Sequence, residues 1–257
     1  MTDKEPEALV ERDGAVLIVT INRPAQKNAM TRSAGELIAT ALDELDSDPT
    51  LSVGVITGAG GTFCSGMDLK RFAAGEPASV PGRGLGGFAQ RPPAKPLIAA
   101  VEGWAVAGGF ELVLACDLVV AAASAHFGLP EVRRGLVAAG GGMFRLPRLV
   151  SRAVAMELIL TGDTVTAERA AALGLVNRLV ADGTALTEAV AFAQRLAANA
   201  PLALAASKRV VVESTDWPIA ESFDRQRVIT DPVFASDDAR EGATAFAEKR
   251  LPVWTGR

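Results

Sequence analysis

Four short apolar runs, rich in β-branched residues, are spaced along the first half of the chain and constrain its fold more than any other feature. They cover residues 15–21, 53–57, 97–101 and 118–121. Runs of this length, separated by turn residues and helical stretches, are typical of buried strands. We therefore predict a sheet whose strands alternate with helices.

Helical patterns lie between these runs, and we predict helices alone after residue 150. Ser33 and Glu36 predict a capping box that opens one helix, and residues 110–116 predict another. Five further helical patterns cover 154–160, 166–173, 186–197, 202–212 and 239–249. The predicted fold class is therefore α/β, with a core over residues 1–200 and a helical C-terminal segment over residues 201–257.

Composition narrows the class of protein. The net charge is −4, tyrosine is absent and aromatic residues make up 5%, which is atypical of nucleic-acid-binding proteins. No apolar run approaches the ~18 residues needed to cross a bilayer, and the polar first seven residues predict no signal peptide. Cys64 and Cys116 are too few for a disulfide framework, which favours the cytoplasm. No Cys/His cluster has the spacing of a zinc site.

Three glycine-containing segments could bind a ligand through backbone N–H groups. Residues 82–87 match G-x-G-x-x-G, but they lie in a Gly/Pro-rich stretch (72–95) that we predict to be a mobile surface loop. Residues 63–70 follow a strand, and an ordinary strand-to-helix turn would also explain them. Residues 105–111 place two glycines at a helix start, where free N–H groups can bind an oxyanion or the glycines can allow close packing.

Two glutamates lie in apolar surroundings. Glu111 falls within a helical stretch of apolar residues, and Glu131 follows Phe-Gly-Leu-Pro. Such surroundings raise a carboxyl pKa and suit it to proton transfer, although each glutamate alone could be structural. His126 is better explained by packing than by catalysis. Cys64 has no base paired with it in the sequence and is interpreted as a small apolar residue.

Six stretches in order resemble the crotonase superfamily, and within it the enoyl-CoA hydratases. The resemblance covers nearly the whole chain, and the stretches that carry it are residues 22–30, 63–70, 96–117, 127–137, 160–180 and 237–250. It implies a spiral of ββα units followed by helices that build a trimer or a pair of trimers. It also implies an acyl-CoA thioester as the ligand, with no metal and no redox cofactor.

The resemblance assigns roles to individual residues. The backbone N–H groups of Met67 and Gly108 would form the oxyanion hole, and Glu111 and Glu131 would hold and activate one water. The positions that match substrate- or CoA-binding residues are Lys27, Ala29, Ser65, Gly66, Asp68, Leu69, Lys70, Ala107, Pro130, Phe246 and Lys249. Phe246 and Lys249 match C-terminal residues that often reach CoA, sometimes in a neighbouring subunit. A local basic rim would let an acidic protein hold this polyanionic ligand.

Some features leave alternatives open. Met143 and Phe144 stand where many hydratases have polar residues near the site, and the ending of the chain is similar to that of carnitinyl-CoA dehydratases. A carnitinyl-CoA dehydratase-like specialist, a Δ3,Δ2-enoyl-CoA isomerase and a non-catalytic acyl-CoA-binding protein are therefore rivals to a hydratase.

One apolar helix face in the sequence indicates self-association. The apolar face of Ala189, Phe192 and Leu196 predicts a surface that is covered in an oligomer rather than by the core of its own chain. Together with the resemblance, this face predicts a homo-trimer or hexamer.

Overall fold

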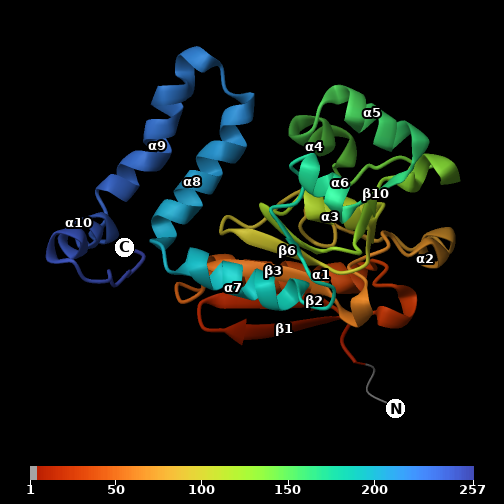
Figure 1. Cartoon of the computed structure of the whole chain (residues 1–257), viewed down its shortest axis with the longest axis horizontal. Helices are drawn as coiled ribbons and strands as arrows, with labels where there is room; N and C mark the ends of the chain where they lie inside the picture. The colour runs from red at the N-terminus through yellow and green to blue at the C-terminus, as the bar shows by residue number, and fades with distance from the viewer. Residues whose placement is uncertain (1–4) are drawn as a thin grey trace.

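The computed structural model describes residues 5–257 as an α/β core beside which three C-terminal helices lie (Figure 1). Residues 1–4, which belong to the segment predicted not to be a signal peptide, lie outside the described part. The strands are β1 Ala8–Asp13, β2 Val16–Ile21, β3 Val53–Gly58, β4 Ser79–Val80, β5 Gly84–Leu85, β6 Leu97–Val101, β7 Trp104–Val106, β8 Leu118–Ala122, β9 His126–Gly128, β10 Thr164–Thr166 and β11 Arg178–Val180. The α-helices are α1 Arg32–Ser47, α2 Leu69–Ala73, α3 Gly108–Leu114, α4 Gly142–Leu149, α5 Arg152–Thr161, α6 Ala167–Ala172, α7 Ala185–Ala197, α8 Pro201–Glu213, α9 Ser222–Phe234 and α10 Asp237–Glu248.

The four predicted strands form the middle of a six-stranded sheet. Its order is β1-β2-β3-β6-β8-β11, with parallel pairing throughout except for the antiparallel hairpin of β1 and β2. β3 and β6 are buried on both faces, which explains why they are continuous apolar runs rather than alternating ones. β1 lies at an edge and exposes most of its residues, so the sequence carried no comparable signal for it.

A second, three-stranded sheet of order β10-β9-β7 lies next to the first. The chain runs from β6 in the large sheet to β7 in the small sheet and then into α3. It repeats this path from β8 to β9 and into a 3-10 helix, η3 (Pro130–Arg134). This repetition is the predicted spiral of ββα units. The prediction of helices alone after residue 150 is wrong, because β10 and β11 have only three residues each and leave no recognisable alternation.

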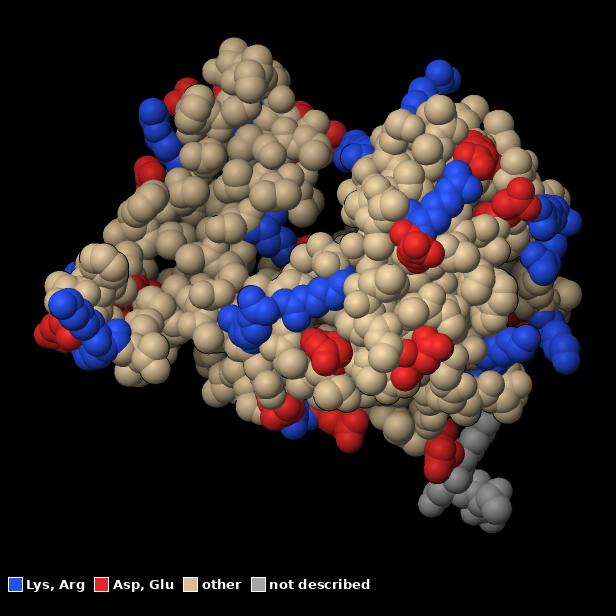
Figure 2. Space-filling model, in the orientation of Figure 1, with Lys and Arg blue, Asp and Glu red and all other residues tan. Residues whose placement is uncertain are grey.

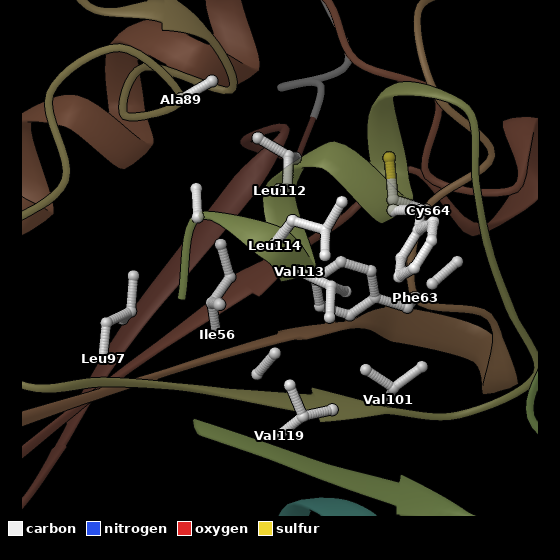
Figure 3. Packing of buried hydrophobic residues seen from close by; sticks show 14 of the residues in the cluster. Ile56, Phe63, Cys64, Ala89, Leu97, Val101, Leu112, Val113, Leu114 and Val119 are labelled. Atoms are coloured by element: carbon white, nitrogen blue, oxygen red, sulfur yellow. The ribbon is translucent and has the colours of Figure 1, made fainter. Parts of the chain in front are cut away.

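Both faces of the large sheet are covered by residues of the same chain. On one face, Ala189 and Ala193 of α7 pack on Val55 of β3 and its neighbours. On the other face, α1 and α3 form the main core, where side chains of α3 meet those of β3, β6 and β8 (Figure 3). The prediction that Ala189, Phe192 and Leu196 face another subunit is therefore wrong, because this face of α7 covers the sheet.

The stretch 72–95 is not simply a mobile surface loop. Leu85, Phe88 and Ala89 are buried in the main core, and the short hairpin of β4 and β5 lies within the stretch. Gly87 has a positive φ, and a Cβ there would lie 2.0 Å from the carbonyl oxygen of Gly35 in α1. The glycines therefore allow backbone to pack against α1, which composition alone does not distinguish from flexibility.

The start of α1 also differs from the prediction. Thr31 caps the helix, since its hydroxyl accepts a hydrogen bond from the Ala34 amide at 3.1 Å. Ser33 lies one residue inside the helix, so the predicted capping box with Glu36 does not form. The residue three positions after Thr31 is Ala34, whereas a capping box has a glutamate or glutamine there. The sequence around Thr31 therefore lacks the pattern by which a capping box is recognised.

The last three helices leave the core after Ala200. Helices α8 and α9 pack against each other as a hairpin, and the molecule is hollowed between this hairpin and the core (Figures 1 and 2). Lys208 of α8 reaches the core, where it pairs with Asp117 at 2.6 Å and donates to the Lys95 carbonyl at 3.0 Å. None of the helices within residues 5–257 combines the length and the apolar character needed to cross a bilayer.

Candidate active site

A cavity of about 790 Å³ lies where both sheets, α2 and α3 meet the loops that follow η3. Its walls come from four parts of the chain, around residues 25–29, 65–72, 106–111 and 130–140, with additions from the 79–90 segment. The carboxyl ends of strands and the start of α3 thus converge on one space. Both glutamates that the sequence singled out line it.

Glu111 projects from the first turn of α3 and is 3% exposed. Its Oε1 accepts a hydrogen bond from the Gly142 amide at 2.9 Å, and the amides of Gly140 and Gly141 also favour its charge. Burial raises the pKa of Glu111, and these amides together with Arg145 oppose the rise. Glu111 is therefore a buried carboxylate whose ionised form is stabilised by backbone amides and a nearby cation.

Glycines allow the backbone to approach Glu111 this closely. A Cβ at Gly140 would lie 2.6 Å from Oε2 of Glu111, and one at Gly142 would lie 3.2 Å from Oε1. Neither glycine has a positive φ. At Gly140 a larger residue is therefore excluded by contact with the carboxylate and not by the backbone conformation.

Glu131 lies in η3 and has the opposite environment. It is 9% exposed, and its buried Oε2 has no hydrogen-bond partner within the described residues. Burial, with a further contribution from the charge of Glu111, raises the pKa of Glu131 to about 7, although Arg134 opposes the rise. Two carboxyl groups in one cavity thus differ in their affinity for a proton, which suits one to act as an acid and the other as a base.

Two backbone amides accompany the carboxyls. The amides of Met67 and Gly108 have no hydrogen-bond acceptor in the described part of the chain. Gly66 lets their segments meet, because a Cβ there would lie 2.8 Å from that of Ala107 and 3.0 Å from the Gly108 nitrogen. Ala107 itself has a φ of 53° and a ψ of −130°, a conformation that is costly for a residue with a Cβ. Two free N–H groups therefore lie next to each other at residues that line the cavity.

The structure brings most of the predicted binding positions to this cavity. Its lining includes Met67, Gly108, Glu111, Glu131 and seven of the other predicted positions, namely Ala29, Ser65, Asp68, Leu69, Lys70, Ala107 and Pro130. Lys27 and Gly66 do not line the cavity, although the Lys27 carbonyl accepts from the amide of Ser65, which does, at 3.1 Å. The Lys27 side chain is exposed at the surface.

Phe246 and Lys249 are not brought to the cavity of their own chain. They lie in and directly after α10, on the far side of the molecule from α2 (Figure 1). Phe246 is 87% exposed there.

Comparison with known proteins places the chain in a family. The family model described as enoyl-CoA hydratase/isomerase matches residues 11–257. This chain belongs to the enoyl-CoA hydratase/isomerase family. It is 43% identical to enoyl-CoA hydratase EchA19 of Mycobacterium tuberculosis over 98% of this chain and 97% of that protein. It is 42% identical to the carnitinyl-CoA dehydratase of Escherichia coli O157:H7 over 96% of this chain and 97% of that protein.

A solved structure supports the same placement. The structure of enoyl-CoA hydratase EchA1 from Mycobacterium marinum superposes with a TM-score of 0.97 at 58% identity, covering 98% of this chain and 100% of that one. The resemblance to the crotonase superfamily and the fold class expected from it are therefore confirmed.

The cavity of this enoyl-CoA hydratase/isomerase family member has further walls that sequence reasoning missed. They come mainly from segments without a catalytic signature and comprise Ala25, Gln26, Phe72, Ser79, Leu85, Gln90, Val106, Arg134, Leu136, Val137, Ala139 and Gly140. Met143 and Phe144, expected near the site, do not line the cavity and are exposed on α4. Ala139 and Gly140 are the residues of this segment that face the cavity.

The other reactive side chains lie outside the cavity. Cys64 is fully buried, and burial raises the pKa of its thiol to about 12, so the thiol packs as an apolar group. His126 stacks on Trp104 with ring centroids 4.6 Å apart, and its Nδ1 lies 2.9 Å from the Ser124 carbonyl oxygen. Both observations agree with the packing roles expected from the sequence.

Proposed function

We propose that the chain is an enoyl-CoA hydratase, which adds water reversibly across the 2,3 double bond of an enoyl-CoA thioester. The observation that carries the proposal is one cavity that contains two buried carboxyl groups of different proton affinity and two free backbone amides. The full-length identity to a protein named as an enoyl-CoA hydratase supports the same reaction.

In the proposed mechanism, the thioester oxygen accepts hydrogen bonds from the amides of Met67 and Gly108. Negative charge grows on this oxygen as the substrate becomes enolate-like, so two fixed donors stabilise the transition state more than the ground state. Backbone donors cost little reorganisation, because Gly66 and the strained Ala107 already hold them in place.

The two glutamates would act on a single water. Glu111, as the ionised base, accepts a proton while the water oxygen bonds to C3, and Glu131, as the neutral acid, delivers a proton to C2. The pair ends with its protonation exchanged, and solvent restores the starting state. A pKa near 7 makes Glu131 an effective donor at neutral pH. Acid, base and oxyanion stabilisation all come from the protein, so the proposal includes no metal and no redox cofactor.

CoA would occupy the outer part of the cavity. Ala29, Ser65 and residues 68–70 would form its wall there, and the exposed Lys27 and Lys70 are candidates for the phosphates. Phe246 and Lys249 would reach the CoA of a neighbouring copy, which needs residues 201–257 to act as an assembly segment. We accordingly propose a homo-trimer or hexamer. A cytoplasmic location is also proposed, because both cysteines are free thiols.

A carnitinyl-CoA dehydratase is the second candidate, since relatives with that name are 42% identical over nearly the whole chain. The acyl group of that substrate carries a quaternary ammonium. Beyond the two catalytic carboxyls, the only carboxylate that residues 5–257 contribute to the lining is that of Asp68, which pairs with Arg23 at 3.0 Å and caps α2. A cationic acyl group would therefore find no free anionic partner, which favours an uncharged acyl group.

The decisive assay measures products by mass spectrometry over short, medium, long and branched enoyl-CoAs, with crotonobetainyl-CoA as the cationic comparison. We expect hydration of uncharged substrates. Preference for crotonobetainyl-CoA would establish the second candidate, and double-bond migration without hydration would establish an isomerase. Failure to convert any of these substrates while binding CoA would indicate a non-catalytic binding protein.

Glu111→Gln and Glu131→Gln test the roles of the two carboxyls. Each variant should lose on the order of 10²-fold or more in hydration, which is the usual scale for general acid–base groups. The double variant should be much less than multiplicatively worse, because both groups act on one water. CoA affinity should change little. Isomerase activity that survives in Glu111→Gln but not in Glu131→Gln would instead favour a single-carboxylate reaction.

Ligand binding gives a test that does not depend on turnover. CoA should raise the melting temperature by mass action, since it binds only the folded state. NADH and magnesium should not. A melting temperature that rises with NADH and not with CoA would overturn the acyl-CoA assignment.

A further inference from the structure

Arg145 of α4 is a partly buried cation that the proposed mechanism does not use. Its Nη2 donates to the Ala89 carbonyl at 2.6 Å and its Nη1 donates to the Gly140 carbonyl at 3.2 Å. No carboxylate lies within 4.0 Å of its guanidinium in residues 5–257, although most other arginines there have ion pairs. The Phe144 ring lies 5.2 Å from the guanidinium carbon as a further contact. A partly buried cation without a carboxylate at ion-pair distance is costly, so its place beside the cavity calls for a functional explanation.

The turn that holds Glu111 is built around this guanidinium. Gly141 has a φ of 117°, and a Cβ there would lie 2.2 Å from Nη1 of Arg145. The Gly140 carbonyl accepts from Arg145 while the Gly142 amide donates to Glu111. One short turn therefore connects the guanidinium to the carboxylate.

The other contact of Arg145 fixes a second wall of the cavity. Ala89 is buried and lies between Leu85 and Gln90, both of which line the cavity. The guanidinium thus joins Ala89 to Gly140, and both of these residues lie outside regular secondary structure. Two loops that form the catalytic cavity share one anchor.

We propose that Arg145 is a positioning residue, which holds the Gly140–Gly142 turn against the Ala89 segment and thereby keeps the Glu111 carboxylate aimed and charged as the base. This inference rests on the proposed hydratase function and assigns a role to a side chain that does not touch the substrate.

The charges around the glutamates support the same role. Glu131 faces Glu111 with like charge, whereas Arg145 is the cation that favours ionised Glu111 and Arg134 the one that favours ionised Glu131. Arg148 and the Cys116 thiol also act on Arg145. Loss of Arg145 should therefore raise the pKa of Glu111, while the larger influences on Glu131 remain.

Arg145→Gln tests the inference, with Arg145→Lys as the conservative variant and Arg148→Gln as the matched control. Arg148 lies on the same helix, is exposed and pairs with Asp216 at 3.1 Å. The measurement is crotonyl-CoA hydration from pH 5 to 9, with kcat and KM separated and the melting temperature of each variant recorded.

Arg145→Gln should lower kcat by about 10- to 100-fold, since misplacing a reacting group by about 1 Å can cost on the order of 10²-fold. Its KM should stay nearly constant, and the acid limb of its pH profile should move to higher pH, because Glu111 must be ionised to accept the proton. Arg145→Lys keeps the positive charge, so its acid limb should lie at the wild-type pH. Its kcat should recover only in part, because lysine cannot make both carbonyl contacts. Arg148→Gln should match the wild type.

Two results would overturn the inference. One is an Arg145→Gln enzyme with unchanged kcat and acid limb. The other is a loss of kcat with an unmoved limb, which would mean a merely structural role. If Arg145→Gln melts below the assay temperature, Arg145→Lys carries the test, and wild-type kcat in Arg145→Lys would then contradict the two-carbonyl anchor.

A second readout separates this inference from the proposed function. Infrared titration of the carboxyl band, taken as the difference between each protein and its Glu111→Gln counterpart, follows the protonation of Glu111 without turnover. The band should titrate at higher pH in Arg145→Gln than in the wild type. A wild type that hydrates no enoyl-CoA would refute the function, whereas equal infrared titrations would refute only the role of Arg145.

Discussion

Gly140 shows at the scale of one residue how little space surrounds the Glu111 carboxylate. Gly140→Ala would place a methyl group 2.6 Å from Oε2, so the carboxylate or the turn must move. We expect hydration to fall by about 10- to 100-fold through kcat, since small displacements of a catalytic group are costly. Gly242→Ala in α10 is a control, because the added Cβ meets only the ring of Trp254 at 3.3 Å. Equal activity of Gly140→Ala and the wild type would contradict this placement of Glu111.

Glu131 makes a second prediction at this scale, which concerns stability. Its pKa is about 7 when folded and near 4.5 when unfolded, so the unfolded chain loses this proton at lower pH. Between these values the folded state binds more protons, and its stability therefore falls as the pH rises, then stays level above about 7. The pKa difference corresponds to at most about 3 kcal/mol.

Glu131→Gln removes this charge, so it should raise the free energy of unfolding at pH 8 by about 1 to 3 kcal/mol, with the gain disappearing near pH 4.5. Denaturant unfolding at pH 5 and pH 8 measures the difference. Glu36→Gln, at an exposed position on α1, is the control and should behave alike at both pH values. A Glu131→Gln protein that is less stable than the wild type at pH 8 would show that the folded state does not disfavour the Glu131 charge.

At the scale of elements, Lys208 and Asp117 form a polar anchor between α8 and the core. Asp117 accepts hydrogen bonds from Lys208 at 2.6 Å and from the Leu97 amide at 2.8 Å, so it joins α8 to the start of β6. Lys208→Met would leave Asp117 without its cation. Removing one partner of a buried pair typically costs about 3 to 5 kcal/mol, and partial exposure reduces this to about 1 to 3 kcal/mol here.

Hydrogen exchange should show the loss of this anchor as faster exchange in α8 than in β6. The double variant Lys208→Met/Asp117→Asn should recover part of the stability, since it no longer leaves a buried charge unpaired. Arg209→Met serves as the control, because Arg209 makes only an exposed pair with Glu213 in the same helix. Unchanged exchange in Lys208→Met would mean that apolar contacts alone hold the helix.

At the scale of the whole molecule, the two phenylalanines of α9 lie exposed, whereas Ile229 of the same helix is buried. Phe223 and Phe234 are 73% and 79% exposed, and their spacing of eleven residues places them on one face of the helix. The region of α8 and α9 carries few charges on the face seen in Figure 2. These observations, rather than the face of α7 suggested by the sequence, support the proposed oligomer.

The variant Phe223→Glu/Phe234→Glu should therefore dissociate the oligomer, because two buried charges would oppose association. Sedimentation velocity should find the wild type as three or six copies of a 26.6 kDa chain and the variant as a monomer. A wild type that is monomeric at micromolar concentration would refute the assembly. An oligomer that persists in the variant would place the interface elsewhere.

The amino-acid sequence alone was enough to predict the four central strands, most of the long helices and the apolar surroundings of both glutamates. These predictions depend on features that are local in the chain: runs of apolar residues, helical spacing, and the contrast of a carboxylate with its neighbours. The same locality explains the misses at β10 and β11, whose three residues are too few to show a period, and at Thr31, whose cap lacks the usual partner.

Only the tertiary structure decided which distant residues meet. Gly142 donates to Glu111 across 31 positions of sequence, and Arg145 reaches Ala89 across 56. Nothing in the composition of 82–90 distinguishes a mobile loop from backbone packed on α1, and nothing in the apolar face of α7 says whether it covers its own sheet or another subunit. The sequence by itself determined which residues can form strands, which can be buried and which can carry a proton. Those properties belong to each residue and its near neighbours. The tertiary structure determined which carboxyl keeps its proton, because that depends on the amides and charges that folding brings around it.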